Sequence, residues 1–259
     1  MIMAGAKILL AGDTVRGLVR ERNEDNFCFV TRPGDNASLV MVADGVGGHL
    51  NGDVASYVCC RMLLDAWRSR NYRELSIPGA EAFLQHAIDA VNERLWHGNR
   101  FAGQGASMGT TLVCAVVFEE HVVVAHAGDS RLYMITPGKE LSLLTKDHSV
   151  QRLIDEKKIG SSVLRTGIQP GNSIFQAVGT CRSLDLEIQT FERPGSARYL
   201  WCSDGLYRYV SEEYMKACLE ECSSGRVALD RLIRAALLAG APDNISAVCG
   251  FPIDETAVQ

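Results

Sequence analysis

The sequence predicts an α+β fold in which two antiparallel β-sheets form a sandwich flanked by pairs of α-helices, in four layers ordered α/β/β/α. Two observations support this fold class. Strand-like runs and helix-period segments follow one another in blocks, and do not alternate as they would in a doubly wound parallel sheet. Several strand-like runs are apolar on both faces, so they need to be covered on both sides.

The order of the elements follows from the local apolar period. Runs rich in valine, isoleucine, leucine and aromatic residues predict strands at residues 27–30, 38–43, 110–118, 121–127, 132–135, 184–191, 199–202 and 245–251. Apolar residues at i, i+3, i+4 spacing predict helices at about residues 53–68, 80–96, 150–158, 212–222 and 227–238. Two helices are therefore expected after the first strands, and two more before the last strand.

The composition fits a single domain over residues 1–259. The chain has 259 residues, of which 47% are hydrophobic and 22% charged. This length and composition suffice for one sizeable core, whereas two ordinary domains would need a longer chain. No low-complexity segment or long linker divides the chain. The formal charge of −5 provides no basic field of the kind that holds nucleic acid or an anionic membrane surface.

The apolar runs and the cysteines indicate a cytoplasmic protein. No apolar run reaches the roughly 18 to 20 residues that a membrane-spanning helix needs, and the first apolar stretch is too short for a secretory signal. The nine cysteines lie mostly in apolar runs without CxxC spacing, which indicates buried, reduced thiols. Cys218 and Cys222 have no matching second pair, so we expect them to pack in the core. We also expect a monomer.

Acidic residues recur at one kind of position, the end of an apolar strand. An isolated Asp-Gly pair between strands is most often a hairpin turn, so each position alone says little. Together they are informative, because the strand ends of one sandwich meet at a common edge, where clustered carboxylates would repel one another and lose hydration. The positions are Asp44 after SLVMVA, Asp129 after VVVAHAG, Asp204 after RYLWCS, Asp243 before ISAVCGF, and Glu24 with Asp25 before FCFV.

Divalent cations would offset this repulsion. Oxygen ligands, without a histidine cluster or a thiolate pair nearby, select Mg²⁺, Mn²⁺ or Ca²⁺ over zinc or copper. Gly45 has no side chain to keep its carbonyl oxygen away from an ion. A carboxylate that bridges two ions suits displacement at phosphorus, and Asp44 and Asp204 are the best candidates for shared ligands. Arg20, four residues before Glu24, is placed to hold two phosphate oxygens, unless it is simply an exposed charge within VRERNED.

Seven motifs, in this order, resemble the bacterial form of the PP2C-type metal-dependent protein phosphatases. They are VRERNEDN, VADGVGG, MGTTL, AGDSRLY, LTKDHS, CSDGL and PDN. The resemblance extends from about Gly12 to Phe251, which is nearly the whole chain. It implies a serine/threonine phosphoprotein phosphatase with a PP2C-like fold that uses two Mn²⁺ or Mg²⁺ ions.

The resemblance also implies which residues hold the ions. Asp44, Asp204 and Asp243 would hold one ion. Glu24, Asp44 and the carbonyl oxygen of Gly45 would hold the second, partly through water. The ligands would thus come from four separate motifs of the chain.

Four further positions follow from the same resemblance. Asp129, together with Asp204, resembles the weaker third-ion position of bacterial members. Arg20 would bind the substrate phosphate and would be catalytic together with Asp44 and Asp204. Asp25, beside the metal-binding glutamate, and Asn244 of the PDN motif would lie behind the ligands and support them.

The implied mechanism is direct in-line attack on phosphorus by a hydroxide that bridges the two ions, without a phosphoenzyme and without a cysteine nucleophile. Val46 stands where animal members carry a histidine proposed as the acid, so the proton donor stays open among a water, His49, Asp147 and His148. Residues at about 149–177 correspond to the mobile flap of the family. TGIQPGNSIF departs from the bacterial pattern there, and we expect substrate preference to reside in this segment.

The expected partners are phosphorylated proteins, as targets of a bacterial serine/threonine kinase or as the kinase itself. Two other functions stay open. A phosphoprotein-binding module would keep the fold without turnover, and loss of a metal aspartate would favour it, but none is missing. A two-metal phosphodiesterase or nuclease would need a basic groove, and the chain offers a single candidate arginine for phosphate.

Overall fold

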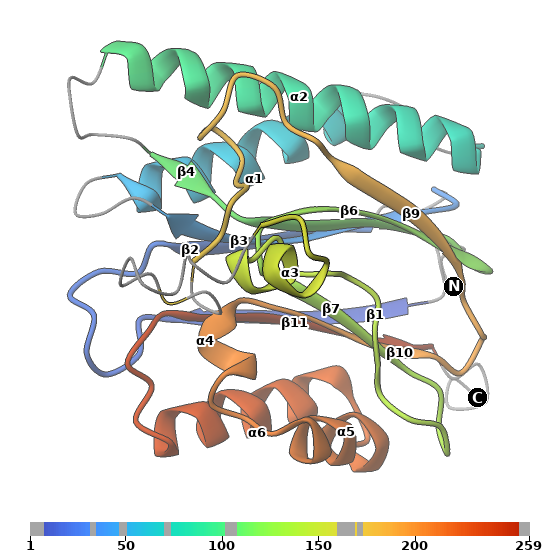
Figure 1. The fold of residues 1–259 in the computed structure, drawn as a ribbon. Helices are drawn as coiled ribbons and strands as arrows, with labels where there is room; N and C mark the ends of the chain where they lie inside the picture. The colour runs from blue at the N-terminus through green and yellow to red at the C-terminus, as the bar shows by residue number, and fades with distance from the viewer. Residues whose placement is uncertain are drawn as a thin grey trace.

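Two antiparallel sheets lie face to face at the centre of the molecule, and helices cover both outer faces (Figure 1). The computed structural model describes residues 8–31, 35–46, 51–69, 74–101, 108–159, 169 and 173–253. Among the helices of these residues, none is both long enough and apolar enough to cross a membrane.

The first sheet has the strand order β1-β11-β10-β7-β8. Its strands are β1 (Ile8–Val15), β7 (Arg131–Ile135), β8 (Ser142–Leu143), β10 (Arg198–Cys202) and β11 (Ile245–Pro252). Ile245 pairs with Val15, and Ala247 pairs with Cys202. The beginning of β11 therefore lies at the same edge as the ends of β1 and β10.

The second sheet has the order β2-β3-β5-β6-β9, with the short β4 paired to the end of β3. Its strands are β2 (Asp25–Val30), β3 (Ser38–Val46), β4 (Gly109–Thr110), β5 (Leu112–Val117), β6 (His121–Ala127) and β9 (Glu187–Glu192). Asp25 pairs with Asp44, so the beginning of β2 and the end of β3 lie side by side.

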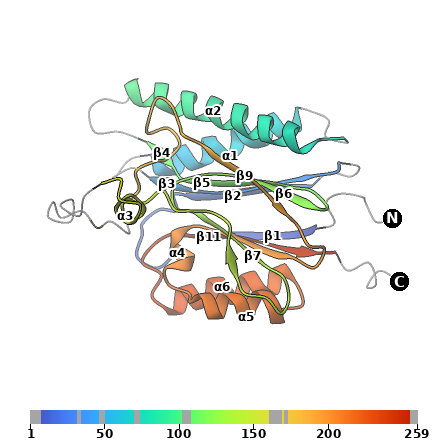
Figure 2. The same ribbon diagram turned by 45° about the vertical axis from the view of Figure 1, so that its right-hand side comes forward.

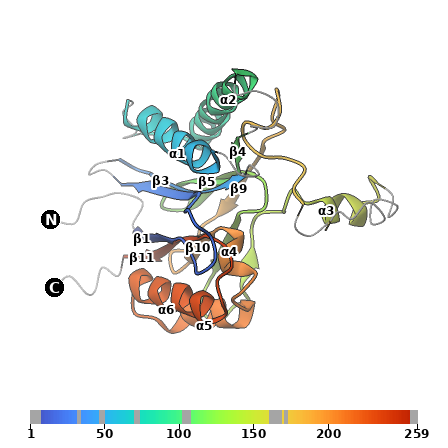
Figure 3. The same cartoon turned by 90° about the vertical axis from the view of Figure 1, so that its left-hand side faces the viewer.

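The helices lie in pairs outside the sheets (Figures 1 and 2). α1 (Gly52–Arg68) and α2 (Ile77–Phe101) cover the second sheet, and α5 (Glu212–Glu221) and α6 (Gly225–Leu238) cover the first. α4 (Asp204–Tyr207) follows β10 after a single residue. α3 (Val150–Asp155) stands to one side of the four layers (Figure 3).

The side chains of β10 show why this strand is apolar on both faces. Tyr199 and Trp201 pack between the two sheets, whereas Leu200 and Cys202 pack against α5 and α6. Successive side chains of a strand point to opposite faces, so a central strand of a four-layer fold contributes to two cores.

The predicted fold class is confirmed, and the predicted strands and helices are found with small changes at their ends.

β1, the two-residue strand β8 and α4 were missed by the sequence analysis. In β1, Gly12 interrupts the apolar run, and the ring of Phe27 occupies the space that a side chain at this position would fill. α4 is a single turn, too short to show an apolar period. Cys218 and Cys222 pack in the core between α5, α6 and the first sheet, as expected.

Candidate functional site

The strand ends that carry the acidic residues meet at one end of the sandwich. Asp25 begins β2 opposite Asp44, near the end of β3. Asp204 begins α4 directly after the first sheet's β10, and Asp243 lies two residues before β11. The charges of Asp25, Asp204, Asp129 and Asp243 all act on Asp44. The fold thus brings together acidic residues from both sheets.

Burial raises the pKa of these carboxyl groups. It raises the pKa of Asp25 to about 7 and that of Asp129 to about 6. Burial, with repulsion from the neighbouring carboxylates, also holds the pKa of Asp44 well above its usual range and raises the pKa of Asp204. A bound cation would act in the opposite direction, because nearby positive charge favours the ionised form.

Asp44 and Asp204 are close enough for their side chains to share a hydrogen bond. Two carboxyl groups can do so only when one of them is protonated. The backbone of Asp44 is held firmly: its N–H donates to Thr111 Oγ1 at 3.1 Å, and its carbonyl oxygen accepts from Thr111 N–H at 2.8 Å. A cation between the two carboxylates would offset their mutual repulsion.

Two glycines allow the backbone segments of the site to approach closely. A Cβ at Gly205 would clash with the backbone carbonyl oxygen of Asn244, and one at Gly45 would clash with the carbonyl oxygen of Gly52. Any side chain at either position would push the segments apart. The Asp-Gly pairs of the sequence therefore serve close packing here and are not hairpin turns.

The side chain of Asn244 fastens the loop before β2 to the loop before β11. Its Oδ1 accepts from Glu24 N–H at 2.9 Å, and its Nδ2 donates to the carbonyl oxygens of Arg16 and Arg22, both at 2.8 Å. Asn244 is 4% exposed, so these bonds are shielded from water. They hold Glu24 and the intervening Arg20 beside Asp243.

Arg20 extends along the acidic cluster. Its Nη2 donates to Asp243 Oδ2 at 2.8 Å, and the charges of Glu24 and Asp44 also act on it. The Arg20 side chain is 49% exposed. A guanidinium in this position can reach a phosphoryl group that approaches the carboxylates from solvent.

Asp25 lies behind the other carboxylates and is held by a pair of serines. Ser203 Oγ donates to Asp25 Oδ2 at 2.7 Å and accepts from Ser246 N–H at 2.9 Å. Asp25 is 6% exposed. This chain of bonds links the beginning of β2 in one sheet to the residue after β10 and to the beginning of β11 in the other.

Asp129 has a partner that the sequence analysis missed. Arg208 Nη2 lies 3.0 Å from Asp129 Oδ2, and Arg208 Nε lies 2.9 Å from Asp204 Oδ2. The guanidinium therefore stands between the two carboxylates of the expected third-ion position. The i, i+4 spacing of Asp204 and Arg208 was the only signal in the sequence, and it is common on any helix surface.

A comparison with known protein families identifies the chain. The family described as protein phosphatase 2C matches residues 19–228. The chain belongs to this family.

Individual PP2C relatives agree with this assignment. The serine/threonine phosphatase stp of Listeria monocytogenes is 36% identical over 236 residues, which are 90% of this chain and 91% of the relative. The crystal structure of the Mycobacterium tuberculosis serine/threonine phosphatase PstP/Ppp has a TM-score of 0.80 at 30% identity, and covers 95% of this chain and 99% of its own. The predicted class is confirmed: the chain is a protein serine/threonine phosphatase.

One solved relative contains metal. The catalytic domain of the phosphatase PstP in complex with two manganese ions has a TM-score of 0.77 and 30% identity to this chain, with 95% of this chain and 99% of that chain covered. The family to which this chain belongs therefore includes a manganese-binding phosphatase, in agreement with the metal dependence that the sequence predicts.

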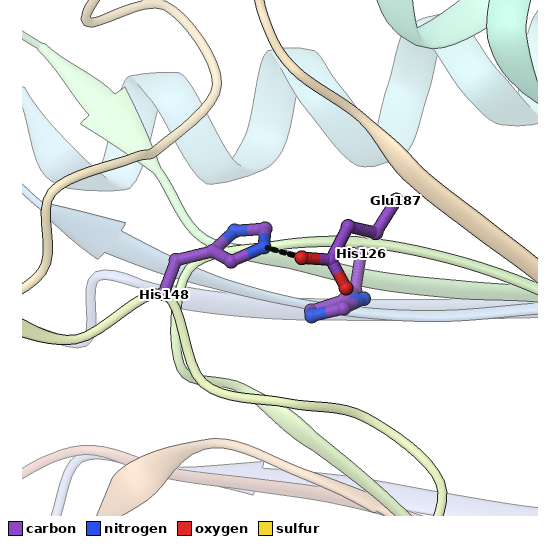
Figure 4. Close-up of side chains that lie close together, drawn as sticks. All are labelled: His126, His148 and Glu187. Atoms are coloured by element: carbon purple, nitrogen blue, oxygen red, sulfur yellow. Dashed lines mark hydrogen bonds and ion pairs between the residues drawn. The ribbon is translucent and has the colours of Figure 1, made fainter. Parts of the chain in front are cut away.

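A second group of potential ligands lies beside the PP2C site. Nitrogen and oxygen atoms of His126, His148 and Glu187 come within 4.8 Å of one another (Figure 4). The two imidazole rings are stacked, with centroids 4.6 Å apart and planes 22° apart. Lone pairs of ring nitrogens lie in the ring planes, so two nearly parallel rings are poorly placed to bind one ion.

Hydrogen bonds account for these polar groups without a metal. Gly128 N–H donates to His148 Nδ1 at 3.1 Å, which leaves His148 Nε2 to donate to Glu187 Oε1 at 3.2 Å. His126 Nε2 bonds to the carbonyl oxygen of Lys146 at 2.8 Å. Burial lowers the pKa of both histidines, as expected for neutral rings. The hydrogen bonds of this group therefore hold the β6–β7 turn against the residues that precede α3.

Only part of the flap segment 149–177 lies within the described residues. Ser149 caps α3 by accepting from Arg152 N–H at 3.3 Å. Val150 N–H donates to Ser173 O at 2.7 Å, and Phe175 N–H donates to His148 O at 2.9 Å. The two ends of the segment are therefore paired. Residues 160–168, 170–172 and most of the TGIQPGNSIF motif lie outside the described residues.

The proposed proton donors can now be compared. Asp147 accepts two hydrogen bonds from Arg131, at 2.9 and 2.7 Å, and His148 is engaged by Gly128 and Glu187. His49 lies outside the described residues. The two candidates whose surroundings are described are therefore engaged in other hydrogen bonds, and the choice between a water and these side chains stays a prediction.

The raised pKa of Asp25 predicts a pH effect on the stability of the metal-free protein. A carboxyl group whose pKa is higher in the folded state binds more protons there, so its contribution to the free energy of unfolding falls as pH rises. For Asp25 this window runs from its ordinary pKa of 3.8 to the raised pKa of about 7. We expect the difference in unfolding free energy, Asp25→Asn minus wild type, to grow across it by up to about 1.4 kcal/mol per pH unit.

Urea denaturation of both proteins in chelator, at several pH values in this window, measures that difference. The comparison between variant and wild type removes the pH effects of groups on which Asp25 does not act, such as the buried histidines. A difference that stays constant or shrinks as pH rises would contradict the prediction.

Proposed function

We propose that Asp44, Asp204, Asp243, Glu24 and the carbonyl oxygen of Gly45 hold two Mn²⁺ or Mg²⁺ ions, at which phosphoserine and phosphothreonine of proteins are hydrolysed. The observation that supports this most strongly is the meeting of Asp44, Asp204 and Asp243 at one end of the sandwich, where Asp44 is partly buried and the neighbouring carboxylates repel it. The ligand atoms that the cluster offers to a metal are all oxygens, which suits hard divalent cations. Raised pKa values show that the cluster is unfavourable as a set of free anions.

The ligand assignment divides the cluster into two overlapping sets. Asp44, Asp204 and Asp243 hold one ion, and Asp44 with Glu24 and Gly45 O hold the other, so Asp44 belongs to both. Glu24 is supported by Asn244, and Asp25 by Ser203. When bound, the ions supply an activated water and the positive charge that displacement at phosphorus needs.

Arg20 binds and orients the phosphoryl group in this proposal. In the structure its Nη2 donates to Asp243 Oδ2 at 2.8 Å. Once Asp243 is committed to an ion, Arg20 can turn its planar fork to two phosphoryl oxygens. Its half-exposed position at the edge of the site supports this role.

Direct attack by water also agrees with the state of the thiols. Burial raises the pKa of Cys202, beside the site, and of Cys60 and Cys114 elsewhere. A thiol must ionise to act as a nucleophile, and a high pKa prevents this near neutral pH. No phosphocysteine step is therefore needed.

We further propose that the enzyme reverses the action of a serine/threonine kinase, as a monomer in the cytoplasm. The nine cysteines are free in the structure, which supports a reducing compartment. Deleting the gene should raise phosphothreonine on proteins of the cell, measured by phosphoproteomics. Unchanged phosphothreonine levels would count against a kinase-opposing role but not against the enzymatic activity.

Replacing Asp204 tests the metal centre. Asp204→Asn keeps the size of the side chain but removes the ligand charge, so we expect phosphate release from a phosphothreonine peptide with Mn²⁺ to fall by about 100-fold or more. Asp230→Asn, an exposed change on α6, is the matched control and should keep wild-type activity. Activity of Asp204→Asn within a few-fold of wild type would remove Asp204 from the centre.

A folded, metal-loaded wild type without any turnover would instead favour the phosphoprotein-binding module. The activity of the wild type should be lost when a chelator is added and should return when Mn²⁺ is added back.

Replacing Arg20 separates substrate binding from metal binding. Arg20→Ala removes the proposed phosphate contact, so KM for the phosphopeptide should rise by about 10-fold, which corresponds to about 1.4 kcal/mol. The affinity for Mn²⁺, measured by calorimetry without substrate, should not weaken, because a positive charge has been removed. Arg61→Ala on α1 is the control, since Arg61 pairs only with the exposed Asp65 among the described contacts. An unchanged KM would refute the role of Arg20.

A further inference from the structure

Arg208 is held between two carboxylates by short contacts at both ends. Its Nη2 contacts Asp129 Oδ2 at 3.0 Å and its Nε contacts Asp204 Oδ2 at 2.9 Å. The Asp129 side chain is 8% exposed and that of Arg208 is 22% exposed, so neither pair is an ordinary surface ion pair. The guanidinium lies in a protected position and not in bulk solvent.

The backbone fixes the point from which Arg208 reaches this position. Arg208 is the C-cap residue directly after α4, and its N–H donates to Asp204 O at 3.1 Å. Gly205 allows α4 to press against the backbone of Asn244. The side chain therefore starts one helical turn from Asp204, which directs its head back over the beginning of α4.

Another acidic group close by does not compete for this guanidinium. Asp147 acts electrostatically on Asp129, but it is bound through two hydrogen bonds to Arg131. Arg131 also lies over the ring of Tyr207, 3.8 Å from the ring centre. Arg131 therefore pairs with Asp147, whereas Arg208 pairs with Asp129 and Asp204.

A third metal ion does not fit this arrangement. An arginine has five N–H donors and no lone pair with which to bind a cation. It also brings a positive charge to the two carboxylates that such an ion would need, and an ion could enter only after the guanidinium had left both of them.

We propose that Arg208 is a built-in replacement for the third metal ion, so that this phosphatase binds two ions and uses its own guanidinium as the third positive charge. Asp129 is then a positioning residue that orients Arg208, and not a metal ligand. This inference rests on the proposed two-ion centre at Asp44, Asp204 and Asp243.

Counting bound Mn²⁺ tests the proposal without reference to activity. Equilibrium dialysis of the full chain against micromolar to millimolar Mn²⁺, followed by elemental analysis, should give two ions for wild type and two for Asp129→Asn. Arg208→Gln should bind a third, weaker ion. The double variant Arg208→Gln with Asp129→Asn should return to two.

Manganese anomalous diffraction from wild-type and Arg208→Gln crystals locates the ions. The third peak should appear beside Asp129 only in the variant. Arg226→Gln, an exposed arginine on α6 paired with Asp13 and Asp230, is the matched control and should bind two ions.

Three results would overturn the proposal. A wild type that binds three ions, one of them lost in Asp129→Asn, would show that Arg208 moves aside for metal, and this comparison does not depend on the folding of any Arg208 variant. A folded Arg208→Gln that still binds two ions would show that Arg208 is not what excludes the third. A wild type that binds no ion would remove the two-ion centre itself, and the proposed function with it.

Discussion

The burial of several carboxyl groups at one end of the sandwich is the constraint on which the rest of the site depends. A carboxyl group removed from water is tolerated when it is protonated, hydrogen-bonded or paired with a cation. Two of these means are present among the described residues. Ser203 donates a hydrogen bond to Asp25, and Arg20 and Arg208 pair with Asp243 and Asp129.

The fold can maintain this unfavourable cluster because its members are attached to well-packed elements. Asp25 and Asp44 are held by the pairing of β2 with β3, and Asp204 by the end of β10, whose side chains fill two cores. The amide of Asn244 and the hydroxyl of Ser203 then join segments of the two sheets. Repulsion among the carboxylates is thus resisted by hydrophobic packing elsewhere, which leaves them close enough to share cations.

Much of this architecture could be predicted from the sequence, for identifiable physical reasons. Strands such as β10 are apolar on both faces because they lie between two cores, and that pattern is visible in RYLWC without any structure. The acidic residues were recognisable because each follows or precedes such a run. β1 was not predicted, since Gly12 breaks its pattern, and the reason for that glycine is the ring of Phe27 on a different sheet.

The contact of Arg208 with Asp129 and the contacts of the histidine group escaped prediction because they join distant parts of the chain. Arg208 reads as one more charge in the run LYRYV, and nothing local reveals that it reaches Asp129, 79 positions earlier. The group of His126, His148 and Glu187 likewise depends on the pairing of β6 with β9 and on the turn at Gly128. Local sequence shows which residues are unusual, whereas partner choice is decided by topology.

The difference between a guanidinium and a divalent ion gives Arg208 its significance for the chemistry. A metal ion exchanges with solvent, carries water molecules, and depends on its concentration in the cell. A guanidinium is permanent, donates hydrogen bonds in one plane and cannot carry an activated water. A positive charge that is always present at Asp129 keeps that end of the site neutralised at any metal concentration. Ions held at Asp44 would then supply the activated water, and the surroundings of Asp129 would influence the reaction through charge and position.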